Sequence, residues 1–331
     1  MPRATHTLML RDYLGSFKAR WGIGRMRYTI NPGLYALGTP DAESMVLVTG
    51  NYKMSFDRLR SALPGFSAWI LVLDTKGINV WCAAGKGSFG TDELVKRILA
   101  VRLDQVVTHR RLILPQLSAP GVAAHEVKKR AGFSVRYGPI KASDIPRFIE
   151  SGFKADPQMR QKSFGLLERM ILIPVELVTA LKWFAFIIAA FLFTEGISGP
   201  ESFWINITEN ALFTTLALTG ALAAGTILTP IFLPWIPGRA FSLKGGIAGI
   251  LIFILLWIYR NPDLNSGTLL LELTGWFFMI PSISAFLGMN FTGASTYTSL
   301  SGVKKEMKWA IPFEISGTLL GLVLWLGSKW I

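Results

Sequence analysis

The stretch Ala68-Trp-Ile-Leu-Val-Leu-Asp-Thr-Lys-Gly-Ile-Asn-Val-Trp-Cys-Ala-Ala-Gly-Lys86 joins an apolar, strand-like run to a short segment of small residues. The second part contains Cys82, the only cysteine in 331 residues. One cysteine cannot close an intramolecular disulfide, and it cannot by itself supply the ligands of a zinc or iron–sulfur site. A free cysteine is most often a small buried apolar side chain. The small residues and the loop that follow Cys82 instead favour a functional thiol beside a large, flat ligand.

Strand-like and helix-like runs alternate on both sides of this stretch. Strands are predicted over residues 45–49, 68–74, 111–114 and 134–137, where apolar or β-branched residues follow one another. Helices are predicted over 55–63, from Thr91 as N-cap, over 123–131, and from Ser143 as cap to about Glu150. Such alternation favours an open α/β sheet with ligands at the carboxyl ends of the strands. Thr49 and Asn79 fall at such ends, which predicts that they lie beside Cys82.

The chain changes character near residue 165. Residues 1–162 contain 25 Lys and Arg against 12 Asp and Glu, whereas the remaining residues contain nine of each kind. All of the net charge of +13 therefore lies in the first half, which is long enough for a globular domain with its own core. We expect one domain over residues 1–165 and a transmembrane domain over 166–331. No apolar run of signal-peptide length follows Met1, so we expect no cleaved signal and a cytoplasmic first domain, where a thiol stays reduced.

Five apolar stretches in the second half are of a length that can span a bilayer. They lie at about residues 170–193, 210–233, 245–259, 267–288 and 309–328, and the third of them is short. Lys and Arg occur before the first, third and fifth stretches and are absent from residues 194–209. Positively charged loops stay in the cytoplasm. The pattern therefore predicts an inner (cytoplasmic) membrane protein with its N-terminus inside and its C-terminus outside.

Charged residues lie within or near these spans at Glu176, Lys182, Glu272 and Glu314. Charge inside a membrane is costly, so such residues are either functional or paired with one another. The spacings Gly245-x-x-x-Gly249 and Gly317-x-x-x-Gly321 fit close helix packing. Residues 288–306 form a hydroxyl-rich loop, which either docks against the first domain or a partner, or only connects two spans.

The sequence motifs of several familiar chemistries are incomplete or absent. Gly85-Lys-Gly-Ser88 lacks the preceding glycine of a P-loop, and a glycine stands where Ser or Thr should follow the lysine. His6, His109 and His125 show no metal-ligand spacing, and no Gly-x-Gly-x-x-Gly follows a strand. The Asp-x-His-x-x-Gly pattern, which gives cobalt a histidine ligand in many cobalamin enzymes, is also absent. The cations are scattered without a nucleic-acid motif, so an anionic membrane surface is favoured over nucleic acid as their partner.

Asn79-Val-Trp-Cys-Ala-Ala-Gly-Lys86 resembles the signature of the corrinoid proteins that methylate mercury in anaerobic microorganisms. The similarity continues through Gly87-Ser-Phe-Gly-Thr-Asp-Glu-Leu94 and includes Val48-Thr-Gly-Asn-Tyr-Lys53 and Gly138-Pro-Ile140. The five-span second half and the Asn290-Phe-Thr-Gly293 loop also resemble that family, so the similarity covers nearly the whole chain. The first half is further similar to the corrinoid domain of the corrinoid iron–sulfur protein of the acetyl-CoA pathway.

This resemblance implies a Rossmann-like α/β corrinoid-binding domain, with a cap helix at residues 80–86, followed by an all-α transmembrane bundle of five helices. It implies that cobalamin binds base-off, with the Cys82 thiolate as the lower axial ligand of cobalt. The residues that it places at the corrinoid are Thr49, Asn51, Asn79, Val80, Trp81, Cys82, Ala83, Ala84, Gly85 and Lys86. A thiolate is a soft, strong donor, which suits transfer of a methyl group with its electrons to the electrophile mercury(II).

The implied function is that of a corrinoid-dependent methyltransferase that methylates mercury(II) and forms methylmercury. The implied partners are a ferredoxin-like iron–sulfur protein as reductant, a methyltetrahydrofolate-linked methyl donor, mercury(II) and the membrane, but no nucleic acid. Two alternatives stay open. In one, the same corrinoid carrier serves another methyl acceptor or the acetyl-CoA pathway. In the other, the chain is a non-catalytic membrane protein whose lone thiol binds a soft metal.

Overall fold

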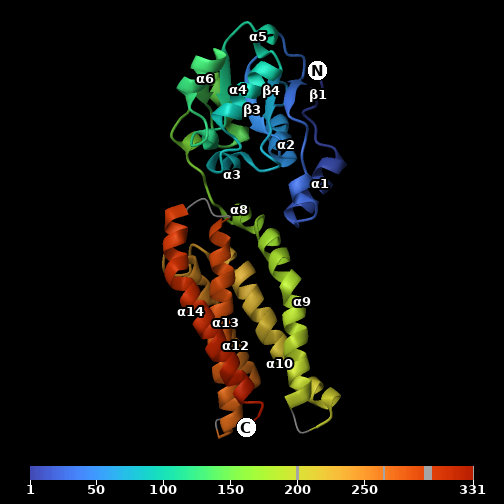
Figure 1. Cartoon of the computed structure of the whole chain (residues 1–331), viewed down its shortest axis with the longest axis vertical. Coiled ribbons are helices and arrows are strands. Elements are labelled where there is room, and N and C mark those ends of the chain that lie inside the picture. The colour runs from blue at the N-terminus through green and yellow to red at the C-terminus, as the bar shows by residue number, and fades with distance from the viewer. Residues whose placement is uncertain (199–200, 264, 294–299, 331) are drawn as a thin grey trace. The chain divides into compact units, whose positions relative to one another are not determined.

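The computed structural model describes residues 1–198, 201–263, 265–293 and 300–330 (Figure 1). Contacts within the chain divide it into two compact units, Met1–Ser163 and Phe164–Ile331. We call them the sheet unit and the helical unit, and each is described by itself.

A mixed sheet of six strands forms the centre of the sheet unit. The strands are β1 Arg3–Ala4, β2 Gly33–Leu37, β3 Val46–Gly50, β4 Ala68–Leu73, β5 Arg111–Leu114 and β6 Ser134–Tyr137. They lie side by side in the order β1-β2-β4-β3-β5-β6. Strands β4, β3, β5 and β6 are parallel, and β2 runs antiparallel to β4. The carboxyl ends of β3 and β4 therefore meet at one edge of the sheet, where open α/β sheets bind their ligands.

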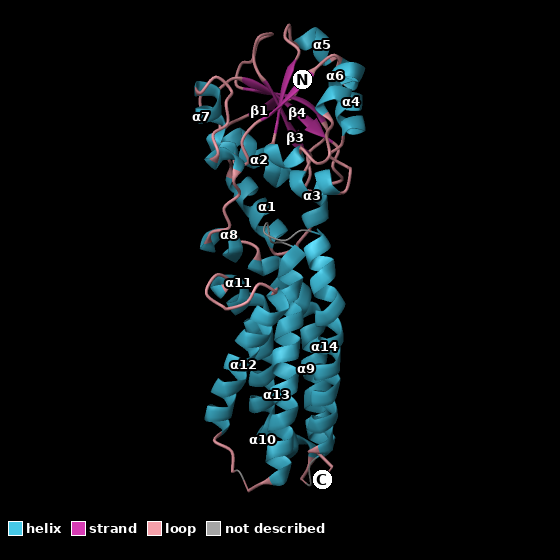
Figure 2. Ribbon diagram, turned by 90° about the vertical axis from the view of Figure 1, so that its left-hand side faces the viewer, coloured by secondary structure: helices cyan, strands magenta, loops and turns pink. Residues whose placement is uncertain are grey.

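Helices cover both faces of this sheet (Figure 2). The helices of the sheet unit are α1 Leu10–Arg20, α2 Lys53–Ser61, α3 Val80–Gly85, α4 Thr91–Ala100, α5 Leu103–Val106, α6 Ala124–Ala131 and α7 Ile145–Glu150, with the 3-10 helices η1 Arg25–Arg27, η2 Gln116–Ser118, η3 Ala142–Asp144 and η4 Gln158–Arg160. Leu71 and Leu73 of β4 pack with α3, α4 and α6 in one buried cluster. Ile70 and Val72 pack with α2 and α7 in a second cluster. Because successive side chains of a strand point to opposite faces, the continuous apolar run of β4 is buried on both.

The four strands predicted from the sequence are all present, with ends that differ by at most one residue. Strands β1 and β2 were not predicted. β1 has two residues, and the five residues of β2 follow Pro32, so neither offers a clear periodic pattern. β2 pairs with β4 along its whole length, from Gly33 opposite Val72 to Leu37 opposite Ala68.

Two predicted helix caps are wrong. Helix α4 has Gly90 at its N-cap, and the Thr91 hydroxyl instead accepts a hydrogen bond from the backbone N–H of Ala123 at 2.9 Å. Ser143 lies inside η3, and Asp144 is the N-cap residue of α7. A side chain that can cap a helix can equally bond to a neighbouring loop, and the local sequence does not distinguish these outcomes.

The described residues of the helical unit include five segments long and apolar enough to cross a membrane. They are Leu166–Ser198, Phe203–Phe232, Phe241–Arg260, Gly267–Gly293 and Ser301–Gly327. Their elements are α8 Leu166–Met170, α9 Ile173–Ser198, α10 Phe203–Ala223, the π-helix η5 Ala224–Leu228, α11 Thr229–Phe232, α12 Phe241–Arg260, α13 Gly267–Asn290, η6 Phe291–Gly293 and α14 Leu300–Gly327. Each predicted span overlaps one of these segments. The third span is longer than predicted, because α12 continues beyond residues 245–259 at both ends.

Helices of this unit approach closely at glycines. Gly245 and Gly249 of α12 lie against the backbone of α13 near Ser284, and Gly321 of α14 lies against another part of α13. A side chain at any of the three glycines would collide with the facing helix. Small residues allow such approach in membranes, where packing rather than the hydrophobic effect drives helix association.

A buried ion triad joins α9, α13 and the segment after α14. The Lys329 ammonium lies 2.8 Å from a carboxylate oxygen of Glu195 and 3.4 Å from one of Glu272. The Thr214 hydroxyl donates to Glu195 at 2.9 Å. Glu272 thus pairs with a residue that was not among the charged residues singled out in the sequence. The carboxylate of Glu314 is buried without a hydrogen-bond partner in the described part of the chain.

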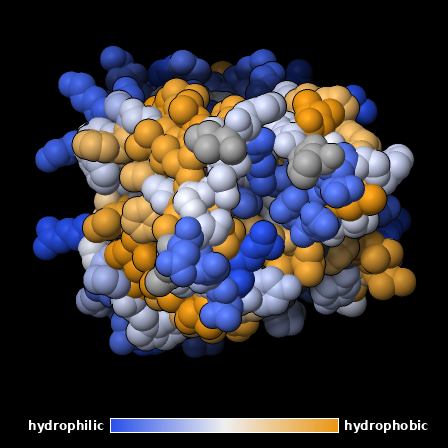
Figure 3. All heavy atoms as spheres, turned by 90° about the horizontal axis from the view of Figure 1, so that it is seen from below, coloured by the Kyte–Doolittle hydropathy of each residue, from blue (hydrophilic) through white to orange (hydrophobic). Residues whose placement is uncertain are grey.

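Figure 3 looks onto the end of the helical unit that carries the C-terminus, and hydrophilic side chains gather there among hydrophobic ones. The hydroxyl-rich loop predicted over residues 288–306 is wrong at both ends, because residues 288–290 belong to α13 and residues 300–306 to α14, and residues 294–299 lie outside the described residues. The part before them is packed inside the helical unit, because Phe291 is buried in a cluster with Phe164 and Phe241.

Candidate functional site

The loop between β4 and α3, residues 74–79, connects the sheet edge to the helix that carries the lone thiol (Figure 1). At its start, Glu93 of α4 accepts a hydrogen bond from the backbone N–H of Asp74 at 2.9 Å. Burial raises the pKa of Asp74, but hydrogen bonds from the backbone and ammonium of Lys76, and the charges of Lys76 and Arg97, outweigh burial and hold that pKa below its usual value. The Asp74–Lys76 ion pair is largely exposed and adds little to stability.

The buried side chain of Asn51 organises this loop from the end of β3. Its amide oxygen accepts three hydrogen bonds, from the N–H and the hydroxyl of Thr75 at 3.0 and 2.9 Å and from the N–H of Gly77 at 3.1 Å. Its amide nitrogen donates to Asp74 at 3.3 Å. The Thr75 hydroxyl has a single proton and also lies 2.7 Å from the carbonyl oxygen of Ile78, so it shares that proton between the two acceptors. Asn51, which was predicted to contact a cofactor, therefore has its amide oxygen engaged in fixing the loop before α3.

Helix α3 begins with a side-chain cap. Asn79 is its N-cap residue, and the Asn79 side-chain oxygen accepts a hydrogen bond from the backbone N–H of Cys82 at 2.9 Å. An N-cap oxygen satisfies one of the N–H groups that the first turn of a helix leaves unpaired. The cap therefore fixes the backbone that carries the thiol.

The two sides of α3 differ in burial. Ala83 and Ala84 are buried in the cluster that contains Leu73, and Val80 packs against it. Trp81 and Cys82 are only partly buried. The helix thus uses its small side chains to pack closely on the core, and its thiol and indole stay accessible.

Packing of α3 against β3 and η2 brings Thr49 into the same region. Thr49 is the last residue but one of β3 and is 3% exposed. Lys86 ends α3 as its C-cap and is exposed, as are Gly85 and Gly87. The predicted site residues are therefore gathered at one edge of the sheet, with Asn51 beneath the loop.

Three residues that shape this region were not predicted. Thr75 and Glu93 hold the loop, as described above. Gly121 lies so close to α3 that a side chain there would collide with the carbonyl of Phe89 and the backbone of Ala84. A Pro-Gly pair at 120–121 is a turn signal, but the sequence does not show which element the turn contacts.

A metal bound at Cys82 must bring most of its own ligands. Within the described residues, no group of three or more His, Cys, Asp or Glu side chains is placed to hold an ion. Cys82 offers one soft sulfur donor in a partly open position. In the described part of the chain, nothing lies within 4 Å of where a side chain on Gly85 or Gly87 would begin. A single sulfur donor fits a metal that is already held by a macrocycle, as in a corrinoid. Such a metal takes one axial ligand from the protein.

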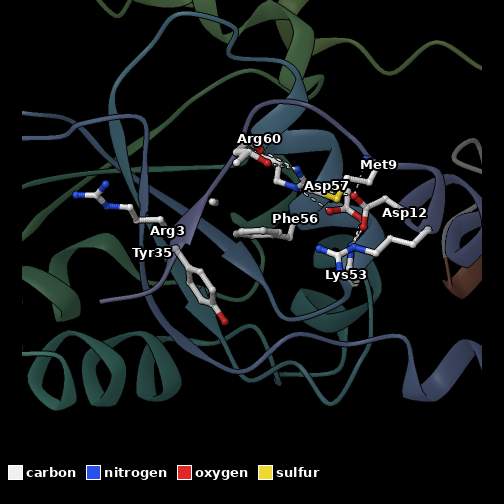
Figure 4. A pocket seen from close by; sticks show the side chains of 11 residues that line it. Arg3, Met9, Asp12, Tyr35, Lys53, Phe56, Asp57 and Arg60 are labelled. Carbon is white, nitrogen blue, oxygen red and sulfur yellow. Dashed lines mark hydrogen bonds and ion pairs between the residues drawn. The ribbon is translucent and has the colours of Figure 1, made fainter.

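A polar hollow of about 430 Å³ lies elsewhere in the sheet unit, lined by β1, α1, β2 and α2 (Figure 4). Asp12, Lys53, Asp57 and Arg60 point toward one another at its wall. None of the predicted site residues, all of which are described, lines it. The hollow is thus separate from the region of Cys82.

Comparison with known proteins identifies relatives of the sheet unit. Residues 24–149 match the family described as CO dehydrogenase/acetyl-CoA synthase delta subunit. Similar proteins include the acetyl-CoA decarbonylase/synthase complex subunit gamma of Methanopyrus kandleri, 33% identical over 124 residues, which are 37% of this chain and 26% of that protein. The corresponding subunits of Archaeoglobus fulgidus and Methanosarcina acetivorans are 28% and 27% identical over 126 and 133 residues, 38% and 39% of this chain and 26% and 28% of those proteins. The chain thus spans about a quarter of the length of these relatives.

The segment that matches the family runs from the residue before η1 into α7 and contains every predicted site residue. The predicted similarity of the first half to a protein of acetyl-CoA metabolism is confirmed over this segment. The segment ends before the helical unit begins, so the family match concerns the sheet unit alone.

Proposed function

We propose that this chain is a membrane-anchored, corrinoid-dependent methyltransferase that transfers a methyl group from base-off cobalamin to mercury(II) and forms methylmercury. In this proposal the Cys82 thiolate is the lower axial ligand of cobalt. The observation that carries the proposal is the placement of the only thiol. It is partly open, it lies on a short capped helix that packs against β3, and it falls within the segment that matches an acetyl-CoA synthase family.

The residues around the thiol divide into those that position it and those that border the ligand. Asn79 holds the backbone of Cys82, and Asn51 holds the loop before it. Both act through backbone geometry. The residues that border the corrinoid in this proposal are Thr49, Val80, Trp81, Gly85 and Lys86, with Ala83 and Ala84 packed on the core behind them.

The corrinoid, when bound, supplies the methyl group that is transferred. The Cys82 thiolate supplies a soft, electron-rich ligand, which favours an acceptor that takes the methyl group together with its bonding electrons, as the electrophile mercury(II) does. A methyl group that leaves with its bonding electrons takes two electrons away. A reductant must supply two electrons before the next methyl group can be accepted. One cysteine cannot hold an iron–sulfur cluster. We therefore propose a ferredoxin-like iron–sulfur protein as the reductant. We also propose a methyltetrahydrofolate-linked methyl donor.

A second candidate function is that of a corrinoid methyl carrier for another acceptor, including the acetyl-CoA pathway. The names of the relatives favour it, because those proteins are subunits of acetyl-CoA decarbonylase/synthase complexes. Both candidates use the same thiol and the same cofactor. They differ in the acceptor, and the acceptor is what must be tested.

The proposal includes a location. The sheet unit lies in the cytoplasm and the helical unit spans the cytoplasmic membrane. The distribution of Lys and Arg between the loops supports this orientation, and the presence of five segments of membrane-spanning length supports the anchoring.

The first experiment tests the cobalt ligand. The chain is purified without oxygen and loaded with cobalamin, and its visible spectrum and cobalt X-ray absorption are recorded. We expect base-off absorbance and a sulfur neighbour of cobalt, and Cys82→Ala should lose the sulfur neighbour. Cys82→His should keep the corrinoid with a changed spectrum, because imidazole also binds cobalt. Only nitrogen and oxygen around cobalt in the loaded wild-type protein would refute the ligand assignment.

Alkylation gives an independent test, because Cys82 is the only thiol. Iodoacetamide should modify the unloaded protein, and loading with cobalamin should protect it. The matched control is Ser88→Cys in a Cys82→Ala background, which places a thiol on a partly buried residue just after the helix. We expect the control thiol to stay reactive after loading. Equal protection of both thiols would point to general shielding and count against ligation.

The second experiment tests the acceptor. The loaded, methylated protein and its reductant are supplied with mercury(II) and, separately, with a thiol and with an acetyl-CoA synthase. Formation of methylmercury that requires Cys82 supports mercury methylation. Transfer to another acceptor with none to mercury(II) would replace it with the second candidate. A protein that binds no corrinoid would remove both candidates and leave a soft-metal-binding membrane protein.

A further inference from the structure

Helix α1 exposes its apolar residues and buries its acid. Asp12 and Ala19 are its buried residues, whereas Leu10, Tyr13 and Phe17 are each more than half exposed. A surface helix of a globular protein has the opposite arrangement, with its apolar stripe against the core. The outward side of α1 therefore needs a partner.

The buried side of α1 is held by charge and by one close approach. The Asp12 carboxylate lies 2.6 Å from the Lys53 ammonium and 2.7 Å from the Arg60 guanidinium, both on α2 (Figure 4). Gly15 lies against the ring of Tyr28, where a side chain would collide. The ion pairs and this contact fix the helix with its apolar residues outward. The exposure is thus a property of how the helix is docked.

The apolar residues of α1 continue into the turn around η1. Residues spaced by three or four positions share one face of a helix. On α1, Leu10, Tyr13, Leu14 and Phe17 follow this spacing. We call the set the α1 surface, and its members, all more than half exposed, are Met9, Leu10, Tyr13, Leu14, Phe17, Ile23 and Met26. Exposed apolar patches of this kind mark contacts with proteins or membranes.

Cations accompany the α1 surface along the sequence. Arg11, Lys18 and Arg27 are exposed, and Arg20 and Arg25 are partly buried. Asp12 is the only acid among residues 1–40, and it is buried and paired. The surface is therefore apolar, partly aromatic and positive, without an accessible negative charge of its own.

We propose that the α1 surface inserts into the headgroup region of an anionic membrane and gives the sheet unit its own contact with the bilayer. Interfacial helices combine aliphatic and aromatic residues with Lys and Arg in this way, and anionic lipids attract cations near the surface. The helical unit of the same chain carries five segments of membrane-spanning length, so a bilayer is within reach of the sheet unit. A protein partner would need acidic groups at matching positions, whereas an anionic leaflet offers negative charge at every position. The inference is independent of the cofactor and of the methyl acceptor.

The test uses the full chain in lipid vesicles, with one fluorescently labelled cysteine in a Cys82→Ala background. Leu14→Cys reports on the α1 surface, and Leu99→Cys, a similarly exposed leucine on α4, is the matched control. The vesicles contain phosphatidylglycerol and phosphatidylcholine, and some lipids carry a spin label on the acyl chain. We expect these lipids to quench the label at position 14 severalfold more than the label at position 99. The difference should shrink in phosphatidylcholine alone and at high salt.

A charge variant tests the part played by the cations. Arg11→Gln combined with Lys18→Gln should reduce quenching at position 14 without changing thermal unfolding, because both side chains are exposed. Equal quenching at positions 14 and 99 would overturn the proposal. A position-14 label whose emission shows an apolar environment, but which the lipid does not quench, would also overturn it. In that case a protein surface, from a second copy or from elsewhere in the chain, covers the helix.

Discussion

At the scale of single residues, Asn51 connects the sheet edge to the helix that carries the thiol. Its amide oxygen satisfies three donors of the loop before α3, and Asn51 is 6% exposed. A buried donor that loses its partner costs about 1–3 kcal/mol. One side chain therefore decides whether the loop, and with it the start of α3, keeps its conformation.

Asn51→Ala should lower the free energy of unfolding of the sheet unit by about 3 kcal/mol, because at least two buried donors lose their acceptor. It should also weaken cobalamin binding while leaving the cobalt ligand unchanged in the protein that does bind. Urea unfolding and cobalamin titration measure the two effects. Ser88→Ala is the control, since within the described residues its hydroxyl makes only one long hydrogen bond of 3.5 Å, to Ala83. If both variants behave alike, the loop does not depend on Asn51.

The part of the site that lies within one short stretch of sequence could be predicted. The part that depends on contacts between distant residues could not be predicted. The thiol, the helix cap and the small residues all lie within residues 79–86. The partners of the Asn51 side chain lie 23, 24 and 26 positions away, and no local pattern reveals that its amide is engaged there. Gly121 was missed for the same reason, because its role depends on which helix lies beside it.

At the scale of elements, an ion cluster joins α1 to α2. Asp12 and Asp57 each contact both Lys53 and Arg60, at distances between 2.6 and 2.8 Å. Burial alone would raise the pKa of Asp12. Hydrogen bonds from Lys53, from the N–H of Met9 and from Arg60 outweigh burial and lower that pKa to about 2.

The stability of the α1–α2 contact should therefore decrease at acidic pH. The pKa of Asp12 is lower in the folded than in the unfolded protein, where it is about 3.9, so its contribution is complete above about pH 4 and is lost as the pH falls to about 2. The loss amounts to about 2 kcal/mol. Urea unfolding between pH 2 and pH 6, an interval set by these values, measures it. Asp12→Asn should be less stable at neutral pH and should lose this part of the acid dependence, whereas Asp104→Asn, an exposed acid outside the cluster, should behave like the wild type.

The ion triad of the helical unit gives a second prediction at this scale. Lys329→Met leaves the buried carboxylates of Glu195 and Glu272 without their shared counter-ion. Breaking a buried pair in this way costs about 3–5 kcal/mol. Thermal unfolding in detergent should show the loss, and adding Glu195→Gln and Glu272→Gln to the same chain should recover most of it. A single variant as stable as the wild type would contradict the buried triad.

Elements with a strong periodic or apolar pattern were predictable, and those defined by their partners were not. Strand β4 is a continuous apolar run, and the five long helical segments are predominantly apolar over a length that can span a bilayer, so hydropathy and length predict both kinds of element. No helix or strand was predicted over residues 1–40. Helix α1 has Gly15 at its centre, and what holds it is an ion pair to α2, 41 positions along the chain.

At the scale of the whole molecule, the two units differ in charge. The excess of 13 positive charges lies in residues 1–162, and the rest of the chain is neutral. Because positive segments stay on the cytoplasmic side, this division predicts the orientation of every loop between the helices. It also ties the location of Cys82 to the topology of the helical unit, since the sheet unit precedes the first long helix.

Single-cysteine labelling tests this orientation directly. In a Cys82→Ala background, Glu201→Cys lies between α9 and α10, and Arg239→Cys lies between α11 and α12; both positions are exposed. With the sheet unit inside, the chain has crossed once before position 201 and twice before position 239. A membrane-impermeant maleimide should therefore label Glu201→Cys in intact spheroplasts, and should label Arg239→Cys only after permeabilisation. The reverse pattern would put the sheet unit outside, where a thiol meets oxidising conditions and a cytoplasmic iron–sulfur reductant cannot reach the site, so the proposed methyl-transfer cycle could not run.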